Sequence, residues 1–241
     1  MDEILCVIWR RMAKYTSQFA TGACVLSDKF SLALHGIWVK IGKPPHDYEF
    51  SDVIMKYTIG VRPQRVRDWS KCTKFYIPVN VRGKNHWILA VVELLSWRII
   101  VYDSIPWVSG SKQELEQHMM PYTTIFPLLL QRTEKFESYK DKFGRDMKLA
   151  SASRSIVPIN AQTWVYDPFM FSCSIKYIGF SYFNTICYLL YCRGDCGVYM
   201  LKTCELLLAS MLLSHGRHLN DKVMDTIRMK YAIDLYTYSC S

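Results

Sequence analysis

A histidine and an aspartate stand at two ends of one predicted β-hairpin. His86 opens a run rich in Val, Ile and Leu, and Asp103 directly follows the next such run. If the turn is centred between Leu95 and Ser96, antiparallel pairing places Asp103 opposite Ile88. His86 then lies one diagonal step away on the same face, because side chains alternate with a period of two. A carboxylate beside an imidazole holds the tautomer of the ring and stabilises its protonated form, as in a catalytic dyad.

A cysteine gives this pair a group to act on. Cys196 lies in a Gly-Asp-Cys-Gly turn at residues 194–197, directly before a strongly apolar segment that is predicted to be helical. A helix N-terminus favours the thiolate over the thiol, and the thiolate is the nucleophile. His86 would take and return the proton of Cys196, and Asp103 would orient the ring.

Each of these residues also has an ordinary structural interpretation. A histidine and an aspartate at strand ends are more often structural than catalytic when nothing else joins them. A Gly-Asp-Cys-Gly turn could serve only to cap a helix, and buried structural cysteines are common. The combination of the three residues is therefore what favours a catalytic site.

The elements that must position these residues can be predicted from composition and periodicity. Three runs rich in β-branched and aromatic residues, 75–81, 87–94 and 97–102, predict a small antiparallel meander. Ser111 and Glu114 form a capping-box pattern that starts a helix, and Pro121 is expected to end it. Further helices are predicted over about 4–14, 51–57, 126–130 and 198–212 and from 220 onwards.

Three short motifs together resemble the ubiquitin-like-protein-specific (SUMO) protease family of cysteine proteases. They are Asn85-His86-Trp87, Val101-Tyr102-Asp103-Ser104 and Gly194-Asp195-Cys196-Gly197-Val198-Tyr199. The order His, Asp, Cys also fits this family, whereas papain-like enzymes place the cysteine first. The chain is similar as well to the protease-like domains of plant transposon-associated genes.

The resemblance implies an α+β fold in which a central mixed or antiparallel sheet is flanked by helices. The sheet would supply His86 and Asp103, and a helix would supply Cys196. A single protease-like domain over 1–241 would cleave the peptide or isopeptide bond after the terminal Gly-Gly of a ubiquitin-like modifier such as SUMO. Trp87 would line the narrow tunnel that admits the diglycine, although a core tryptophan is an equally good interpretation. The opening residues 1–5 look like the latter part of the family's Trp-Leu-x-Asp motif, which would place a second tunnel tryptophan upstream.

The sequence departs from the family pattern before the cysteine. The family has a glutamine six residues before it, whose amide helps to bind the oxyanion, and Leu190 occupies that position here. The segment 165–192 is aromatic and almost uncharged, without a period of 2 or 3.6. We interpret 165–192 as a foreign or degenerate insertion that displaced the glutamine. Gln162 lies just before it and is a poor substitute.

Composition sets limits on partners and compartment. Thirty Lys and Arg against 21 Asp and Glu give a net charge of +9, which favours an acidic partner. The basic string 62–74 reads better as a solvated face than as a nucleic-acid site, because it has few interleaved aromatics. Nine cysteines without a Cys-x-x-Cys pair indicate reduced thiols in a reducing compartment.

The remaining expectations concern cofactors, membranes and rival functions. No cofactor is expected, and His215 and His218 lack the further ligands that a metal site needs. The acidic start, Asp2-Glu3, is unlike a signal peptide, and no stretch reaches the ~20 apolar residues of a spanning helix. The family resemblance implies a monomer in the nucleus or nucleocytoplasm. The alternative function is a catalytically impaired homologue that binds a ubiquitin-like protein or nucleic acid.

Overall fold

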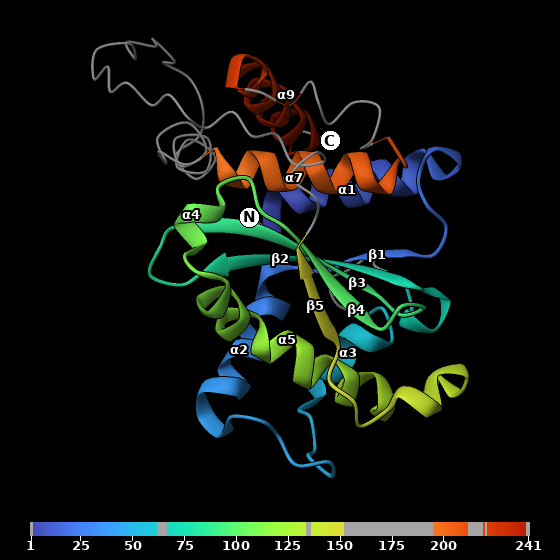
Figure 1. Cartoon of the computed structure of the whole chain (residues 1–241). Helices are drawn as coiled ribbons and strands as arrows, with labels where there is room; N and C mark the ends of the chain where they lie inside the picture. The colour runs from blue at the N-terminus through green and yellow to red at the C-terminus, as the bar shows by residue number, and fades with distance from the viewer. Residues whose placement is uncertain are drawn as a thin grey trace.

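The structure is a computed structural model of the chain, and it describes residues 2–61, 67–133, 136–151, 195–211, 219 and 221–239. Its centre is a five-stranded sheet in the order β1-β2-β3-β4-β5 (Figure 1). The strands are β1 (Ala23–Val25), β2 (Lys74–Val81), β3 (His86–Glu93), β4 (Arg98–Tyr102) and β5 (Lys148–Ser151). β2, β3 and β4 pair antiparallel, as the predicted meander requires, while β1 and β5 add to its two sides in parallel. The α+β fold with a mixed sheet is confirmed.

The register between β3 and β4 is the predicted one. Leu89 pairs with Tyr102 and Ala90 pairs with Val101. The next step along the ladder would place Asp103 opposite Ile88, one diagonal step from His86. Alternation along the two strands therefore brings the ends that carry the imidazole and the carboxylate to the same end of the sheet.

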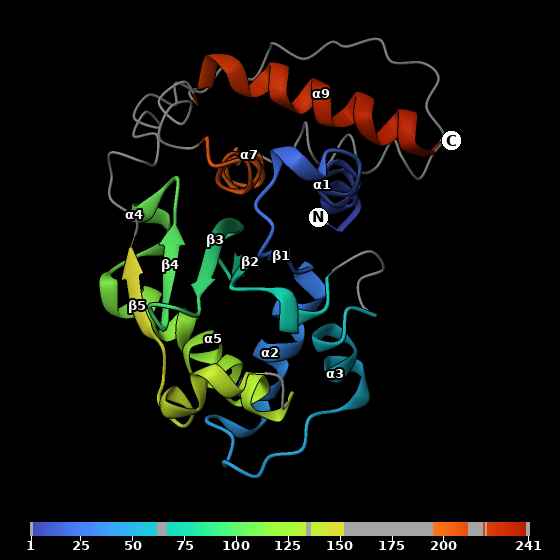
Figure 2. The same ribbon diagram turned by 90° about the vertical axis from the view of Figure 1, so that its right-hand side faces the viewer.

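Helices cover both faces of the sheet (Figures 1 and 2). One face packs against α2 (Asp28–Ile41), α3 (Asp52–Thr58) and α5 (Lys112–Arg132). The other packs against α1 (Asp2–Lys14), α7 (Cys196–Leu208) and α9 (Asp221–Ser239). Four short helices complete the described chain: η1 (Thr16–Gln18), η2 (Trp69–Lys71), α4 (Pro106–Ser109) and η3 (Glu137–Lys142).

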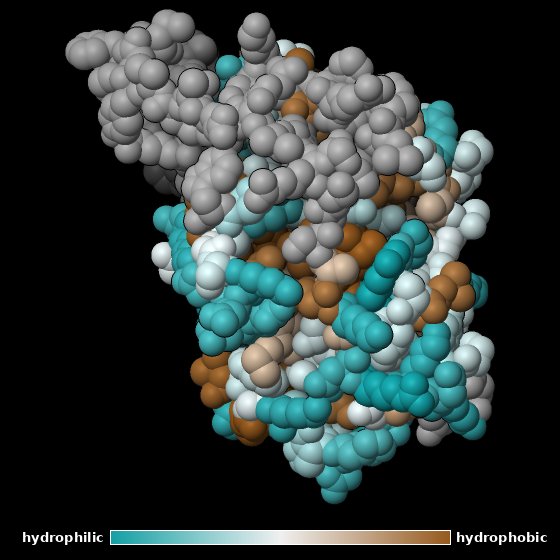
Figure 3. Space-filling view, in the orientation of Figure 1, coloured by the Kyte–Doolittle hydropathy of each residue, from teal (hydrophilic) through white to brown (hydrophobic). Residues whose placement is uncertain are grey.

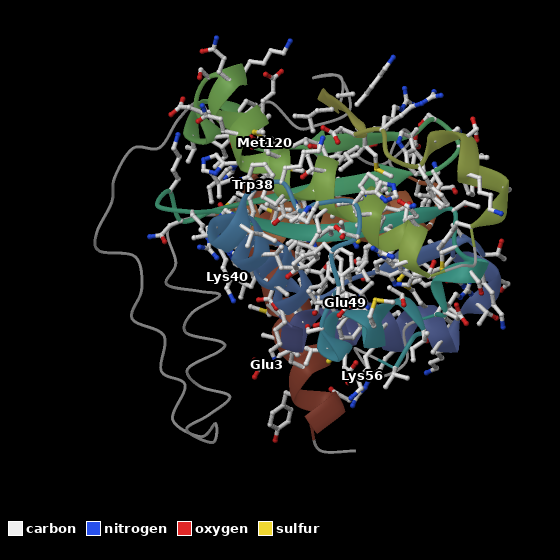
Figure 4. All side chains as sticks on the ribbon, turned by 90° about the horizontal axis from the view of Figure 1, so that it is seen from below. Glu3, Trp38, Lys40, Glu49, Lys56 and Met120 are labelled. Atoms are coloured by element: carbon white, nitrogen blue, oxygen red, sulfur yellow. The ribbon has the colours of Figure 1, made fainter. Side chains whose placement is uncertain are left out.

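The core between the sheet and the α2–α5 layer is built around an aromatic cluster. Phe30, Trp69, Phe75 and Phe126 are all fully buried. Trp69 stacks on Phe126 with ring centroids 5.0 Å apart, and Phe75 meets the same Phe126 ring edge-on at 5.2 Å. Burial of such rings is among the largest apolar contributions that a single residue can make to folding. Figure 4 views this layer from below, with Trp38 and Lys40 on α2 and Met120 on α5.

The prediction that Pro121 ends the helix after Ser111 is wrong. The capping box of Ser111 and Glu114 is present, but α5 continues through Pro121 and Pro127 to Arg132. A proline has no N–H and leaves the carbonyl four residues earlier without its helical donor. The carbonyl of Thr123, which Pro127 leaves in this way, accepts a hydrogen bond from the Met147 N–H at 2.9 Å. Pro127 thus frees a carbonyl through which α5 binds the segment that leads into β5.

The hydropathy of the surface and of the helices can be described separately. Figure 3 shows that the lower part of one face is largely hydrophilic, with hydrophobic residues scattered among the polar ones. Among the helices that the structure describes, none combines the length and the apolar character needed to cross a bilayer.

Candidate active site

His86 and Asp103 form a buried pair at one end of the sheet. Nε2 of His86 lies 2.7 Å from Oδ1 of Asp103, and the two residues are 1% and 9% exposed. An ionised carboxylate can only accept a hydrogen bond, so Nε2 carries the hydrogen. Nδ1 is therefore the ring nitrogen left to exchange a proton with another group.

Asp103 is itself held by two further donors. The Ile105 N–H donates to Oδ1 at 2.9 Å, and the Ser109 hydroxyl donates to Oδ2 at 2.5 Å. Both donors come from the turn and the short helix α4 that follow β4. Nothing in the sequence pattern pointed to Ser109, because a lone serine at the end of a four-residue helix has no periodic signature.

Cys196 is the first residue of α7, and α7 packs on β3. Its Sγ accepts a hydrogen bond from the Trp87 N–H at 3.4 Å and lies 3.9 Å from the Asn85 carbonyl oxygen. The thiol therefore lies against the backbone on both sides of His86. The structure brings the predicted nucleophile, imidazole and carboxylate together.

The electrostatics of this end of the sheet favour a protonated imidazole. Burial by itself lowers the pKa of His86, but the hydrogen bonds and charges of Asp103 and Cys196 outweigh it and raise that pKa to about 9. The imidazolium is then the main form of His86 at neutral pH. This positive ring lies beside the Cys196 sulfur, which is at the N-terminus of α7.

The residue before the nucleophile is tied to the last helix. Asp195 is 4% exposed, and its carboxylate forms an ion pair with Arg228 of α9. Arg228 also pairs with Asp225 at 2.8 Å. The turn that carries Cys196 is thus fixed from the side opposite to the sheet.

The far end of α7 is anchored by a second set of charges. Glu205, 5% exposed, pairs with Arg11 of α1 and with Lys202, the latter at 2.8 Å. The Tyr231 hydroxyl donates to the same carboxylate at 3.0 Å, and Arg11 also pairs with Asp234. The three helices α1, α7 and α9 are therefore joined around one buried carboxylate. The sequence did not predict this network, since its members are far apart in the chain.

Of the other residues singled out from the sequence, Trp87 is among those that the structure describes. The side chain of Trp87 is half-buried on the face that packs against α1, α7 and α9, and its backbone N–H contacts the thiol. Its role in binding substrate stays a prediction. Gln162, Leu190, the segment 165–192, His215 and His218 lie outside the described residues. Within the described residues, no three His, Cys, Asp or Glu side chains gather in a way that could hold a metal ion.

Comparison with known proteins identifies the class of this fold and site. The model of the Ulp1 protease family, C-terminal catalytic domain, matches residues 39–162 and 187–241. The chain belongs to the Ulp1 protease family and is a cysteine protease of that family. None of the curated proteins matches the chain.

A solved structure of a SUMO protease has a similar fold. The SUMO protease Ulp1 with its catalytic cysteine oxidised to a sulfonic acid is 14% identical, with a TM-score of 0.51, over 97% of this chain and 78% of that one. The same protease in the sulfenic acid form is 15% identical, with a TM-score of 0.49, over 98% and 77% of the two chains. The family model leaves residues 163–186 unmatched. The division of the chain into one domain with an insertion at 165–192 stays a prediction.

Proposed function

We propose that the chain hydrolyses the peptide or isopeptide bond that follows the terminal Gly-Gly of a ubiquitin-like modifier of the SUMO type. Cys196 is the nucleophile, His86 is the general base and acid, and Asp103 orients the ring. The observation that carries the proposal is the buried 2.7 Å His86–Asp103 pair with the Cys196 sulfur lying beside it.

The chemistry follows from this arrangement. The Cys196 thiolate attacks the carbonyl carbon of the terminal glycine, and the His86 imidazolium gives its proton to the departing amine. The thioester is then attacked by water, from which neutral His86 removes a proton, and the thiolate leaves. The backbone N–H of Cys196, at the start of α7, is the donor available to the developing oxyanion.

The choice of substrate rests on the family and on charge. The structural relatives are SUMO proteases, and the chain carries a net charge of +9, which complements an acidic modifier. Trp87 is half-buried next to the thiol, where its ring can form one wall of a channel for a slim diglycine. A monomeric protease in the nucleus or nucleocytoplasm is part of the same proposal, and a fluorescent fusion with size-exclusion chromatography tests both properties.

An activity probe tests the assignment directly. A SUMO-type protein whose terminal glycine carries a carbon electrophile should form one covalent adduct, at Cys196, seen by intact mass and peptide mapping. Cys196→Ser should abolish the adduct. Cys6→Ser, which changes an exposed cysteine of α1, is the matched control and should label like the parent. An adduct that persists in Cys196→Ser would overturn the assignment of the nucleophile.

A binding module is the second candidate, and Leu190 is the observation that favours it. Loss of one oxyanion donor raises a barrier by ~2.7–4 kcal/mol, which would leave binding intact while slowing cleavage. Titration of the unmodified SUMO-type protein against the chain separates the two functions. Tight binding without any adduct at Cys196 would support the impaired homologue, and an adduct with turnover of a diglycine-linked fusion would support the enzyme.

A further inference from the structure

Both oxygens of the Asp103 carboxylate are occupied, but by different kinds of partner. Oδ1 faces His86 Nε2 at 2.7 Å and the Ile105 N–H at 2.9 Å. Oδ2 accepts the hydroxyl of Ser109 at 2.5 Å. A carboxylate held at one oxygen alone can rotate about its bond to Cβ, whereas a donor on each oxygen fixes the plane in which it meets the imidazole.

We propose that Ser109 is a positioning residue of the cysteine protease site, and that it acts through Asp103. Its hydroxyl fixes the Asp103 carboxylate, and that carboxylate fixes the His86 ring against Cys196. The inference rests on the proposed roles of His86, Asp103 and Cys196. It adds a fourth side chain to that arrangement.

The place of Ser109 in the fold supports a role for its hydroxyl. Ser109 is 1% exposed, so its hydroxyl is shielded from the solvent that could otherwise replace it. A buried hydrogen bond to a charged acceptor is worth more than one between neutral groups, and leaving the acceptor short of a donor is costly. The Ser109 hydroxyl therefore holds Oδ2 of Asp103 at a place where solvent cannot substitute for it.

A lysine holds the turn that presents Ser109. Lys84, in the turn between β2 and β3, donates its Nζ to the Ser109 carbonyl at 3.0 Å and pairs with Glu114 at 3.3 Å. Gly110 has a positive φ of 97°, and a Cβ there would overlap the end groups of Glu114 and Lys84. Lys84 precedes His86 by two residues, so one turn contacts both the imidazole strand and the serine that positions its carboxylate.

The test is a double-mutant cycle on the full chain. Ser109→Ala should lower kcat/KM on a diglycine-linked SUMO-type fusion about ten- to a hundredfold, the loss expected for a hydrogen bond to a charged group, with KM little changed. In an Asp103→Asn background the same substitution should change kcat/KM by less than about twofold, because its effect passes through the carboxylate. Ser109→Thr keeps the hydroxyl and should restore most of the rate. Lys84→Met should cause a smaller loss in the same direction.

A second readout does not depend on the substrate. Alkylation of Cys196 by iodoacetamide, followed by peptide mass spectrometry against pH, reports the thiolate that His86 stabilises. Ser109→Ala should move the acid side of that profile to higher pH, as Asp103→Asn should, and the double variant should move it no further. Equal loss from Ser109→Ala in both backgrounds would overturn the positioning role. If the variants show these alkylation shifts but the parent chain cleaves no diglycine fusion, the proposed function would be overturned and the role of Ser109 would stand.

Discussion

The His86 imidazole lies between a carboxylate and a sulfur, and both favour its positive form. Burial opposes that charge, yet the pKa of His86 is raised to about 9 because the two partners outweigh the loss of water. An ordinary histidine changes charge near pH 6.5. At this position the ring therefore holds its proton across the physiological range, as the proposed general acid requires.

The first prediction concerns the carboxylate. Asp103→Asn should lower kcat by as much as ~10⁴-fold. An amide can donate an N–H to the ring, which favours the wrong tautomer, and a neutral amide cannot stabilise the imidazolium. Binding of the SUMO-type partner should stay near that of the parent, since Asp103 is 9% exposed. Single-turnover kinetics and a binding titration measure the two quantities separately. Equal turnover in the two proteins would show that Asp103 does not orient His86.

The second prediction concerns pH. Because the pKa of His86 is raised to about 9, kcat/KM should be sustained through neutral pH and fall as the pH rises through about 9, where the imidazolium loses its proton. Asp103→Asn removes one of the two groups that raise the pKa, so the alkaline limb should move to lower pH. A pH series of kcat/KM for both proteins checks the direction. An alkaline limb that stays in place in the variant would contradict this assignment.

The proximity of His86 and Asp103 could be predicted from the sequence, but the residues that hold them in place could not. Strand alternation and the position of the turn were enough to place Asp103 near His86, because the turn of a hairpin fixes the register of its two strands. The glycine-flanked turn predicted Cys196 at the head of a helix, and Cys196 is the first residue of α7. Its role as nucleophile stays a prediction. Ser109 and Arg228 could not be foreseen, since each acts through a contact whose partner no local pattern specifies.

Among the elements, the helices show where local patterns mislead. No helix was predicted over the segment that forms α2, although Ser27 caps it by accepting the Phe30 N–H. Gly36 and several β-branched residues weaken its intrinsic preference, and packing on β2 and α5 overrides that weakness. The strands β1 and β5 span three and four residues, too few for a period-two pattern to be recognised.

The third prediction belongs to the helices α1, α7 and α9. Arg11→Met removes the cation that lies between Glu205 and Asp234, and it should lower the free energy of unfolding by about 3 kcal/mol because the buried Glu205 carboxylate loses one of its two cationic partners. Urea denaturation measures this change.

The matched control for Arg11→Met is Lys43→Met. Lys43 pairs with Asp146 at 2.8 Å, but the two side chains are 59% and 47% exposed. That surface ion pair should contribute at most about 1 kcal/mol. Similar losses from the two substitutions would mean that the network around Glu205 adds no more than an ordinary surface pair.

At the scale of the whole molecule, the stretch that the family model leaves unmatched before Cys196 overlaps the stretch of unusual composition. The family model does not match residues 163–186, and these overlap the aromatic segment 165–192. Leu190 itself lies within the matched residues 187–241. That 165–192 is an insertion that displaced a glutamine stays a prediction.

The fourth prediction tests that insertion. Replacing 165–192 with a short loop that sets a glutamine six residues before Cys196 should raise turnover ~100- to 1000-fold, because it restores an oxyanion donor. The control is the same loop with leucine at that position, which should fold equally well and stay slow. Turnover per folded molecule on a diglycine-linked fusion compares the three proteins. If the glutamine version cleaves no faster than its leucine control, the displaced-glutamine hypothesis is wrong.

The order of the site along the chain has a consequence for biosynthesis. The meander that holds His86 and Asp103 is made of neighbouring strands with short turns, so it can form while the rest of the chain is still being made. Cys196 follows much later, and α7 gains its full anchorage only after Arg228 and Tyr231 of α9 have been made. Cys196 is thus made after the strands that carry His86 and Asp103, and its support on α9 is made after Cys196 itself. A nascent chain released before α9 would carry His86, Asp103 and Cys196 but lack Arg228 and Tyr231, which bind Asp195 and Glu205 at the two ends of α7.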